Sequence, residues 1–169
     1  MGIAEPLLKR VLATIFANLM GSLLPESPLI QGILQGGKLK LWRYIEALTH
    51  RETVMGQLDA FFSEWDAWLC PVTCGPAFPH VKLKGNLDSL FKELPVDDQI
   101  LPYNVWGLTH APLFNLTGNP VVVIPVGQSQ EGLPIGIQVV GKRWRDRGLL
   151  AIAQQLSNVV GVWRRPPGY

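Results

Sequence analysis

The stretch Phe114–Gly141 reads FNLTGNPVVVIPVGQSQEGLPIGIQVVG and decides most of the predicted fold. It contains two apolar runs, Val121–Val126 and Ile135–Val140, each of which follows a proline. The linker Gly127–Leu133 is too short for a parallel crossover, which needs about a dozen residues. The two runs are therefore predicted to be antiparallel strands. Because both runs are almost continuously apolar, we expect central strands that are covered on both faces.

The residues upstream of this stretch indicate a long helix followed by a short strand. Apolar residues recur at helical spacing from about Leu39 to Trp65. The apolar segment Asp66–Val72 then contains a proline and is interpreted as a short buried strand. Residues 80–103 show no clear period, so we expect a long surface excursion, a type of segment that often forms a lid or a binding loop.

Two shorter helices complete the expected order of elements. Val105–Leu116 is predicted to be a short helix or helical turn before the first strand of the pair. Asp146 is placed to cap a last helix, Arg147–Val160. The resulting pattern is that of an α/β protein in which helices cover a sheet.

An amphipathic helix is predicted near the start of the chain, over Leu7–Leu24. Ten apolar residues recur there at positions i, i+3 and i+4, and Pro25 and Pro28 end the pattern. Packing of this helix on a protein core is the ordinary interpretation, and self-association or adsorption to a membrane surface is the alternative. The apolar runs are far shorter than the ~20 residues that span a bilayer, and Leu7–Leu24 does not have the features of a signal peptide.

The composition favours a domain that needs additional cover. Of the 169 residues, 47% are hydrophobic and 17% are charged, against about 25% charged in typical soluble domains. We therefore expect either a piece of a larger protein or a membrane-associated surface. The net charge of +2 argues against nucleic acid as a partner. Cys70 and Cys74 match neither a zinc site nor a redox pair, so two free thiols and a cytoplasmic location, with peripheral membrane association as an extension, are expected.

Several motifs occur in an order that is known from one enzyme family. They are Trp65–Pro71 (WDAWLCP), Gly75–Ala77 (GPA), Asn115–Pro120 (NLTGNP), Pro125–Gly127 (PVG) and Gly132–Gln138 (GLPIGIQ). In this order and spacing the chain resembles the C-terminal part of the amidase signature enzymes, notably members similar to fatty acid amide hydrolases. The resemblance is clear over residues 39–169 and loose over residues 1–38, so we expect residues 1–169 to form a partial amidase signature domain.

The resemblance implies a fold and a chemistry. The implied fold is α/β, with a mixed sheet core and helices on both of its faces. The implied reaction is hydrolysis of a carboxamide to an acid and ammonia or an amine, without a cofactor or a metal. Family members use a Ser–Ser–Lys relay, because a free serine hydroxyl is a poor nucleophile. No serine of this chain lies in a Gly/Ser-rich loop. We therefore expect no catalytic residue in this chain, and a small-molecule amide as substrate only when an upstream half completes the site.

Four residues are candidates for one wall of an acyl-side substrate pocket. Thr73, Cys74, Phe78 and Trp106 lie in or after the loop that follows the expected strand Asp66–Val72. Sites in α/β proteins form at the carboxyl ends of strands. Structural packing is an equally good interpretation of each of the four residues.

Two alternatives complete the sequence-based interpretation. Gly127–Glu131 approaches the G-x-S-x-G nucleophile elbow, but its fifth residue is wrong and it joins two strands, so a plain turn is predicted. The chain as a whole is either the C-terminal portion of an amide hydrolase or a non-catalytic remnant that binds a partner chain or a membrane through exposed apolar surface. An upstream reading frame that encodes a Gly/Ser-rich loop and a lysine would favour the first interpretation.

Overall fold

The computed structural model describes residues 31–32, 35–80, 92–107 and 109–161. The predicted helix Leu7–Leu24 lies outside these residues. The elements follow one another as α3 (Leu41–Glu64), β1 (Trp68–Pro71), β2 (Glu93–Val96), β3 (Gln99–Pro102), α5 (Tyr103–Trp106), α6 (Pro112–Thr117), β4 (Val121–Gln128), β5 (Pro134–Val140) and α7 (Asp146–Val160).

Three of the strands form one antiparallel sheet in the order β1-β5-β4, and β2 pairs with β3 separately. The β4–β5 register runs from Val121 opposite Val140 to Gln128 opposite Pro134, and it shifts between Pro125 and Gly127. The predicted antiparallel pair is therefore confirmed. The α/β class is also confirmed, since helices pack against this sheet.

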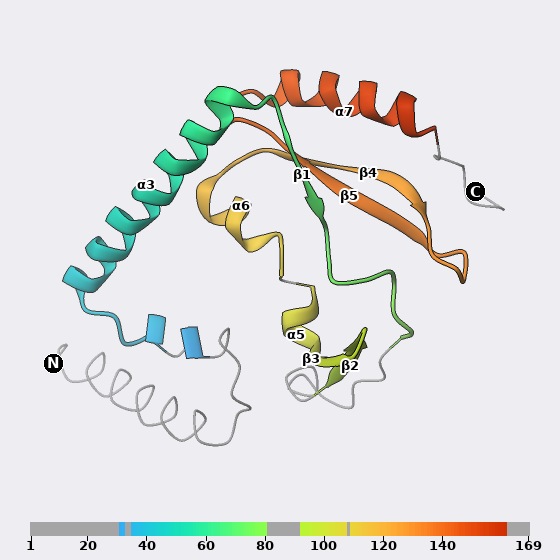
Figure 1. Cartoon of the computed structure of the whole chain (residues 1–169). Coiled ribbons are helices and arrows are strands. Elements are labelled where there is room, and N and C mark those ends of the chain that lie inside the picture. Colours follow the sequence, from blue (N-terminus) through green and yellow to red (C-terminus); the bar gives the residue numbers. More distant parts are fainter. Residues whose placement is uncertain (1–30, 33–34, 81–91, 108, 162–169) are drawn as a thin grey trace, which may run out of the picture.

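Helices lie on both faces of the sheet, as expected. On one face, Leu149 and Ala153 of α7 are buried against Ile124 and Val139. On the other face, side chains of α3 and α6 form a second cluster around Val140, made of Leu58, Phe62 and Phe114. Figure 1 shows α7 lying along the sheet, with β2, β3 and α5 grouped below it.

The expectation that both strands are central and covered on both faces holds only in part: β5 is central and is buried over Gln138–Val140, but Ile135 near its start is 37% exposed. β4 is at the edge of the sheet formed by the described residues, and the Val123 side chain is 53% exposed. The α3–α6 cluster covers the Val140 end of the sheet and does not include Val123. A continuous apolar run shows that a strand needs cover, but it does not show which polypeptide supplies that cover.

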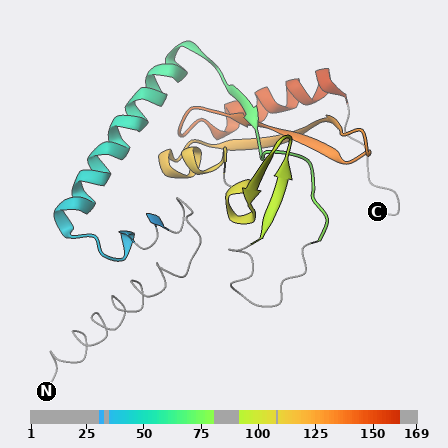
Figure 2. The ribbon, with the colours of Figure 1, turned by 60° about the horizontal axis from the view of Figure 1, so that its bottom comes forward.

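The long predicted helix is confirmed as α3, with ends that differ by one or two residues. Its apolar stripe is divided, however. Met55, Leu58 and Phe62 in the second half are buried, whereas Leu41 and Ile45 in the first half are exposed. Figures 1 and 2 show the first half of α3 extending away from the sheet.

The expectation of an irregular excursion over residues 80–103 is wrong for its second part. Residues 93–102 form the β2–β3 hairpin, in which the Asp97–Asp98 turn holds Asp97 at a φ of 50°. Pro95 and Pro102 lie within the two strands. Proline removes a backbone donor and usually argues against a strand, which is why the hairpin pattern was obscured in the sequence.

Two helix boundaries also differ from the prediction. In place of one helix over Val105–Leu116, the chain forms α5 and α6, and α6 begins at Pro112, a residue type favoured in the first turn of a helix. Asp146 is the first residue of α7, and Arg145 occupies the N-cap position without a side-chain hydrogen bond. The acidic side chain therefore complements the helix dipole from the first turn instead of capping the helix.

Candidate substrate pocket

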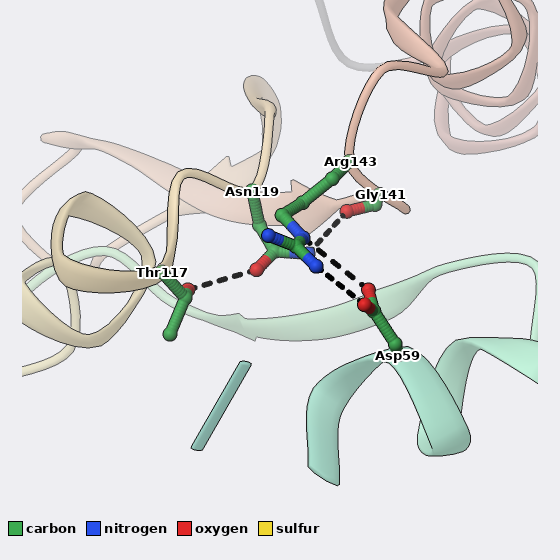
Figure 3. A network of polar contacts seen from close by, with 5 residues as sticks. All are labelled: Asp59, Thr117, Asn119, Gly141 and Arg143. Carbon is green, nitrogen blue, oxygen red and sulfur yellow. Dashed lines mark hydrogen bonds and ion pairs between the residues drawn. The ribbon is translucent and has the colours of Figure 1, made fainter. Parts of the chain in front are cut away.

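The NLTGNP motif has a structural role beside the sheet. Thr117 is fully buried, and its hydroxyl lies 2.8 Å from Asn119 Oδ1. Asn119 Nδ2 donates to the Gly141 carbonyl oxygen at 2.9 Å, and Gly118 between the two residues ends α6 at a φ of +73°. Figure 3 shows the Asn119 side chain between Thr117 and Gly141. The motif therefore joins the end of α6 to the end of β5.

Two arginines hold α3 against the same region. Arg143, just after β5, makes two hydrogen bonds to the carboxylate of Asp59 on α3, and these bonds raise the pKa of the guanidinium. Arg51 Nε donates to the Leu116 carbonyl oxygen near the end of α6, at 2.6 Å. Figure 3 shows the Arg143–Asp59 pair reaching from the sheet to the helix. These contacts join α3 to the segment after β5 and to the end of α6.

The GLPIGIQ motif also positions a strand. Gly132 adopts a φ of +81° in the β4–β5 turn, a conformation that favours glycine. Gly136 leaves room for Val123, because an added Cβ would lie 2.9 Å from Val123 Cγ1. The buried Gln138 donates from Nε2 to the Pro71 carbonyl oxygen at 2.7 Å, which fastens the end of β1 to β5. The loop that follows β1 therefore starts from a fixed point.

The loop after β1 is organised by one polar contact and by aromatic packing. The Thr73 hydroxyl donates to the Gly75 carbonyl oxygen at 2.8 Å. The Phe78 ring meets the Trp106 ring edge to face at 4.8 Å between centroids, and it meets Tyr103 in the same way at 5.5 Å. Trp106 is buried, whereas Phe78 is half-buried. This packing joins the loop to α5 over about thirty residues of intervening sequence.

A pocket of about 250 Å³ lies between this loop and the β2–β3 hairpin. Its lining is mainly apolar, with one carboxylate at the hairpin turn. The lining residues are Cys74, Gly75, Pro76, Ala77, Phe78, Pro79, Leu94, Pro95, Val96, Asp97 and Trp106. Such an arrangement suits an apolar group of a small molecule, since ligand pockets are mostly apolar with a few polar groups.

Polar groups lie at one side of the pocket. Cys74 Sγ is 3.3 Å from Thr109 Oγ1, which in turn is 2.8 Å from His110 Nδ1. The other thiol, Cys70 on β1, is partly buried, and burial raises its pKa. Within the described ranges, no three His, Cys, Asp or Glu side chains come together as a metal site would require.

Ser129 lies in the turn between β4 and β5, which confirms the predicted turn. Its backbone N–H donates to the Leu133 carbonyl oxygen at 2.8 Å, and its hydroxyl accepts from the Leu133 N–H at 3.3 Å. A hydrogen bond from Ser129 also lowers the pKa of Glu131. The serine is thus part of a β-hairpin turn, whereas a nucleophile elbow joins a strand to a helix.

Three of the four candidate residues lie in the lining of this pocket, together with residues that the sequence analysis did not propose. Of the four candidates, Cys74, Phe78 and Trp106 line the pocket, and Thr73 lies next to it through its bond to Gly75. The residues contributed by β2 and the contact from Tyr103 were not foreseen. The sequence feature that could have predicted the hairpin is the pair of four-residue segments on either side of Asp97–Asp98. The prolines in these segments obscured the strand pattern.

The fold is α/β, with helices on both faces of an antiparallel sheet. Residues 7–150 match the sequence model of the family described as Amidase. Because this match covers most of the chain, the protein belongs to the amidase family.

Two curated relatives illustrate the range of the family. The chain is 30% identical over 127 residues to a protein named fatty acid amide hydrolase from Medicago truncatula, covering 73% of this chain and 19% of that protein. It is 29% identical over 124 residues to a subunit of glutamyl-tRNA(Gln) amidotransferase from Brevibacillus brevis, covering 73% of this chain and 22% of that protein. The chain thus spans about a fifth of the length of these relatives.

The chain is also similar to part of solved amidase structures. A crystal structure of an amidase is similar to this chain with a TM-score of 0.58 and 26% sequence identity, over 79% of this chain and 29% of that one. This likeness supports an amidase fold for the part of the chain that it covers. Within the described residues, no helix is both long enough and apolar enough to cross a membrane.

Proposed function

We propose that this chain is the C-terminal portion of an amide hydrolase and forms one wall of its acyl-side substrate pocket. The observation that carries the proposal is the apolar pocket of about 250 Å³ in which Phe78 and Trp106 meet edge to face. Membership of the amidase family supports amide hydrolysis as the reaction, with cleavage of a C–N bond to give an acid and ammonia or an amine.

The pocket favours a substrate whose acyl side is apolar. Most of its lining consists of proline, aliphatic and aromatic side chains, and Asp97 is the one charged residue among them. An apolar acyl or aryl group would leave few buried polar atoms unpaired there. Thr73, Cys74, Phe78 and Trp106 are the residues of this chain that we assign to the substrate, and we assign no residue to the chemical step.

The isolated chain is expected not to turn over amides. The serines of the sequence are Ser22, Ser27, Ser63, Ser89, Ser129 and Ser157, and none lies in a Gly/Ser-rich loop. Without a nucleophile and its base, a hydrolase typically loses several orders of magnitude in rate. A cytoplasmic location, with peripheral membrane association as an extension, belongs to the same proposal, and the two free cysteines support the cytoplasmic assignment.

The test measures turnover and binding on the full chain. We expect no release of ammonia from a long-chain primary amide at the ~1 per second that is typical of enzymes. The same uncleaved amide should bind weakly in calorimetry, and Phe78→Ala should weaken that binding at least threefold. Trp42→Ala is the matched control, because Trp42 is 57% exposed on α3 and does not line the pocket. Turnover that Ser129→Ala abolishes, or equal binding by Phe78→Ala and the parent, would contradict the proposal.

A second candidate function is a non-catalytic role as an interaction protein. The observation that favours it is the exposed apolar row on the first half of α3, where Leu41, Tyr44 and Ile45 are between 50% and 75% exposed. Such a row is a typical partner surface. Amide binding that Phe78→Ala leaves unchanged, together with binding of a partner chain through this row, would favour this second candidate.

A further inference from the structure

Among the described residues, the outer side of β4 is a free sheet edge, because β4 ends the order β1-β5-β4 and no described strand pairs with its second side. An edge strand presents unpaired backbone N–H and C=O groups that can pair with another strand. The direction of each group along β4 can be derived from the register.

The hydrogen-bond phase of β4 follows from one contact. The Gly141 N–H donates to the Pro120 carbonyl oxygen at 2.9 Å. Pro120 and Gly141 are therefore a hydrogen-bonded pair, and the next pair along the ladder is Val121 opposite Val140. Hydrogen-bonded and non-hydrogen-bonded pairs alternate along an antiparallel ladder. Val122 and Ile124 therefore bond to β5, and the backbone groups of Val121 and Val123 face outward.

The backbone groups of Pro125 also face outward, because Pro125 is two residues beyond Val123 in the same strand. Its missing N–H therefore lies on the free side and removes nothing from the β4–β5 ladder, which is the position that proline tolerates in strands. The register shift between Pro125 and Gly127 ends the regular edge. The free edge thus offers two donors, from Val121 and Val123, and three acceptors, from these two residues and Pro125.

We propose that two copies of this chain pair through their β4 edges, antiparallel and centred on Val123. In this register each Val123 N–H donates to the carbonyl oxygen of the partner subunit's Val123. Each Val121 N–H donates to the carbonyl oxygen of the partner subunit's Pro125. All outward donors of both copies are then satisfied, and the proline lies where no donor is needed. The pairing is self-complementary, as two-fold symmetric interfaces require.

The side chains along this edge fit the same pairing. Val121 is 37% exposed and Val123 is 53% exposed, and the two-fold arrangement places the two Val123 side chains beside each other. The strand Val121–Gln128 carries no charged residue. Natural edges that avoid pairing usually carry lysine or other charges. This interface is independent of the pocket and does not rest on the proposed function.

The test uses charge reversal at the symmetry centre, followed by sedimentation equilibrium over a concentration series. Val123→Lys and Val123→Asp each place like charges opposite each other and should weaken dimerisation roughly tenfold or more. An equimolar mixture of the two variants should restore the dimer. Val123→Pro should abolish the contact between the β4 edges while leaving the fold intact, because the N–H that it removes faces outward; any association that remains uses another segment. Val123→Thr, which keeps both the N–H and the β-branch, is the matched control and should still dimerise.

Each other result overturns the proposal. A parent chain that stays monomeric at all concentrations shows that the edge does not pair, or that another part of the chain covers it. Association that is equal in all four variants places the contact elsewhere. A loss of far-ultraviolet circular dichroism in Val123→Pro would mean that the Val123 N–H bonds to β5 and does not face outward. That result would overturn the proposal whatever the charge variants do.

Discussion

At the residue scale, the family motifs of this chain mainly define packing and chain direction. Gly118 ends α6 in the left-handed region, Asn119 bonds to Gly141, and Gln138 fastens β1 to β5. An apolar side chain in place of Asn119 or Gln138 would leave a backbone carbonyl without this donor, and the φ of +73° at Gly118 is strained for other residues. These motif residues hold α6, β1 and β5 together, and the loop after β1 that lines the candidate pocket starts from this region.

Two glycines allow this packing argument to be tested. An added Cβ at Gly141 would lie 3.1–3.2 Å from three atoms of Leu149, whereas one at Gly136 would lie 2.9 Å from a single atom of Val123. The shorter contact should nevertheless cost less, since Val123 is 53% exposed and can move, while Leu149 is 3% exposed. We expect Gly141→Ala to destabilise the protein by about 1–2 kcal/mol and Gly136→Ala by less than about 1 kcal/mol. Urea unfolding at equal protein concentration would measure both values, and a larger loss for Gly136→Ala would contradict this reasoning.

The sequence could identify such residues as motif members but not their contacts. The positions of Gly132 and Gln138 follow from the local pattern, since Gly132 lies in the predicted β4–β5 turn and Gln138 lies opposite Val123 in the same strand pair. The ion pair between Asp59 and Arg143 joins residues 84 positions apart. Nothing in local spacing specifies such a pair, because it depends on the angle at which α3 meets the sheet.

At the element scale, the segments with strong helical or continuous apolar patterns were predictable, and the β2–β3 hairpin was not. α3, β4, β5 and α7 have strong helical or apolar patterns, and their ends differ from the prediction by no more than two residues. The β2–β3 hairpin was missed because two prolines interrupt its strands. That miss also hid half of the candidate pocket, since Leu94, Val96 and Asp97 line it from β2 and the hairpin turn.

The divided burial of α3 predicts a gradient in backbone protection. Met55, Leu58 and Phe62 anchor the second half of the helix, whereas Leu41 and Ile45 are more than half exposed. Helix stability in proteins comes mainly from packing of the apolar face. Amides of residues 45–49 should therefore exchange faster with solvent deuterium than those of residues 58–62, as measured by mass spectrometry of peptides. Equal protection along α3 would show that the first half is covered in solution.

At the scale of the whole molecule, the described part of the chain leaves many large apolar side chains in contact with solvent. Much of the described exposed surface is apolar, including the first half of α3 and the Val123 region of β4. Association is therefore the physical expectation, and β4 accounts for one contact.

The apolar stripe of the predicted helix Leu7–Leu24 predicts a second contact between chains. Variants can distinguish this contact from the one through β4. Fully burying a leucine-sized side chain is worth roughly 1.5–3 kcal/mol, so a stripe of ten apolar residues should find cover on another chain or on a membrane. Phe16→Asp introduces a charge within the stripe, whereas Thr14→Asp introduces the same charge on the polar side of the predicted helix. With Val123→Pro in both chains, Phe16→Asp should strongly reduce the remaining self-association and the co-sedimentation with lipid vesicles. Thr14→Asp should change neither quantity much. If both variants behave like the Val123→Pro parent, the stripe is already packed on the chain's own core, and the protein is more self-sufficient than its exposed surface indicates.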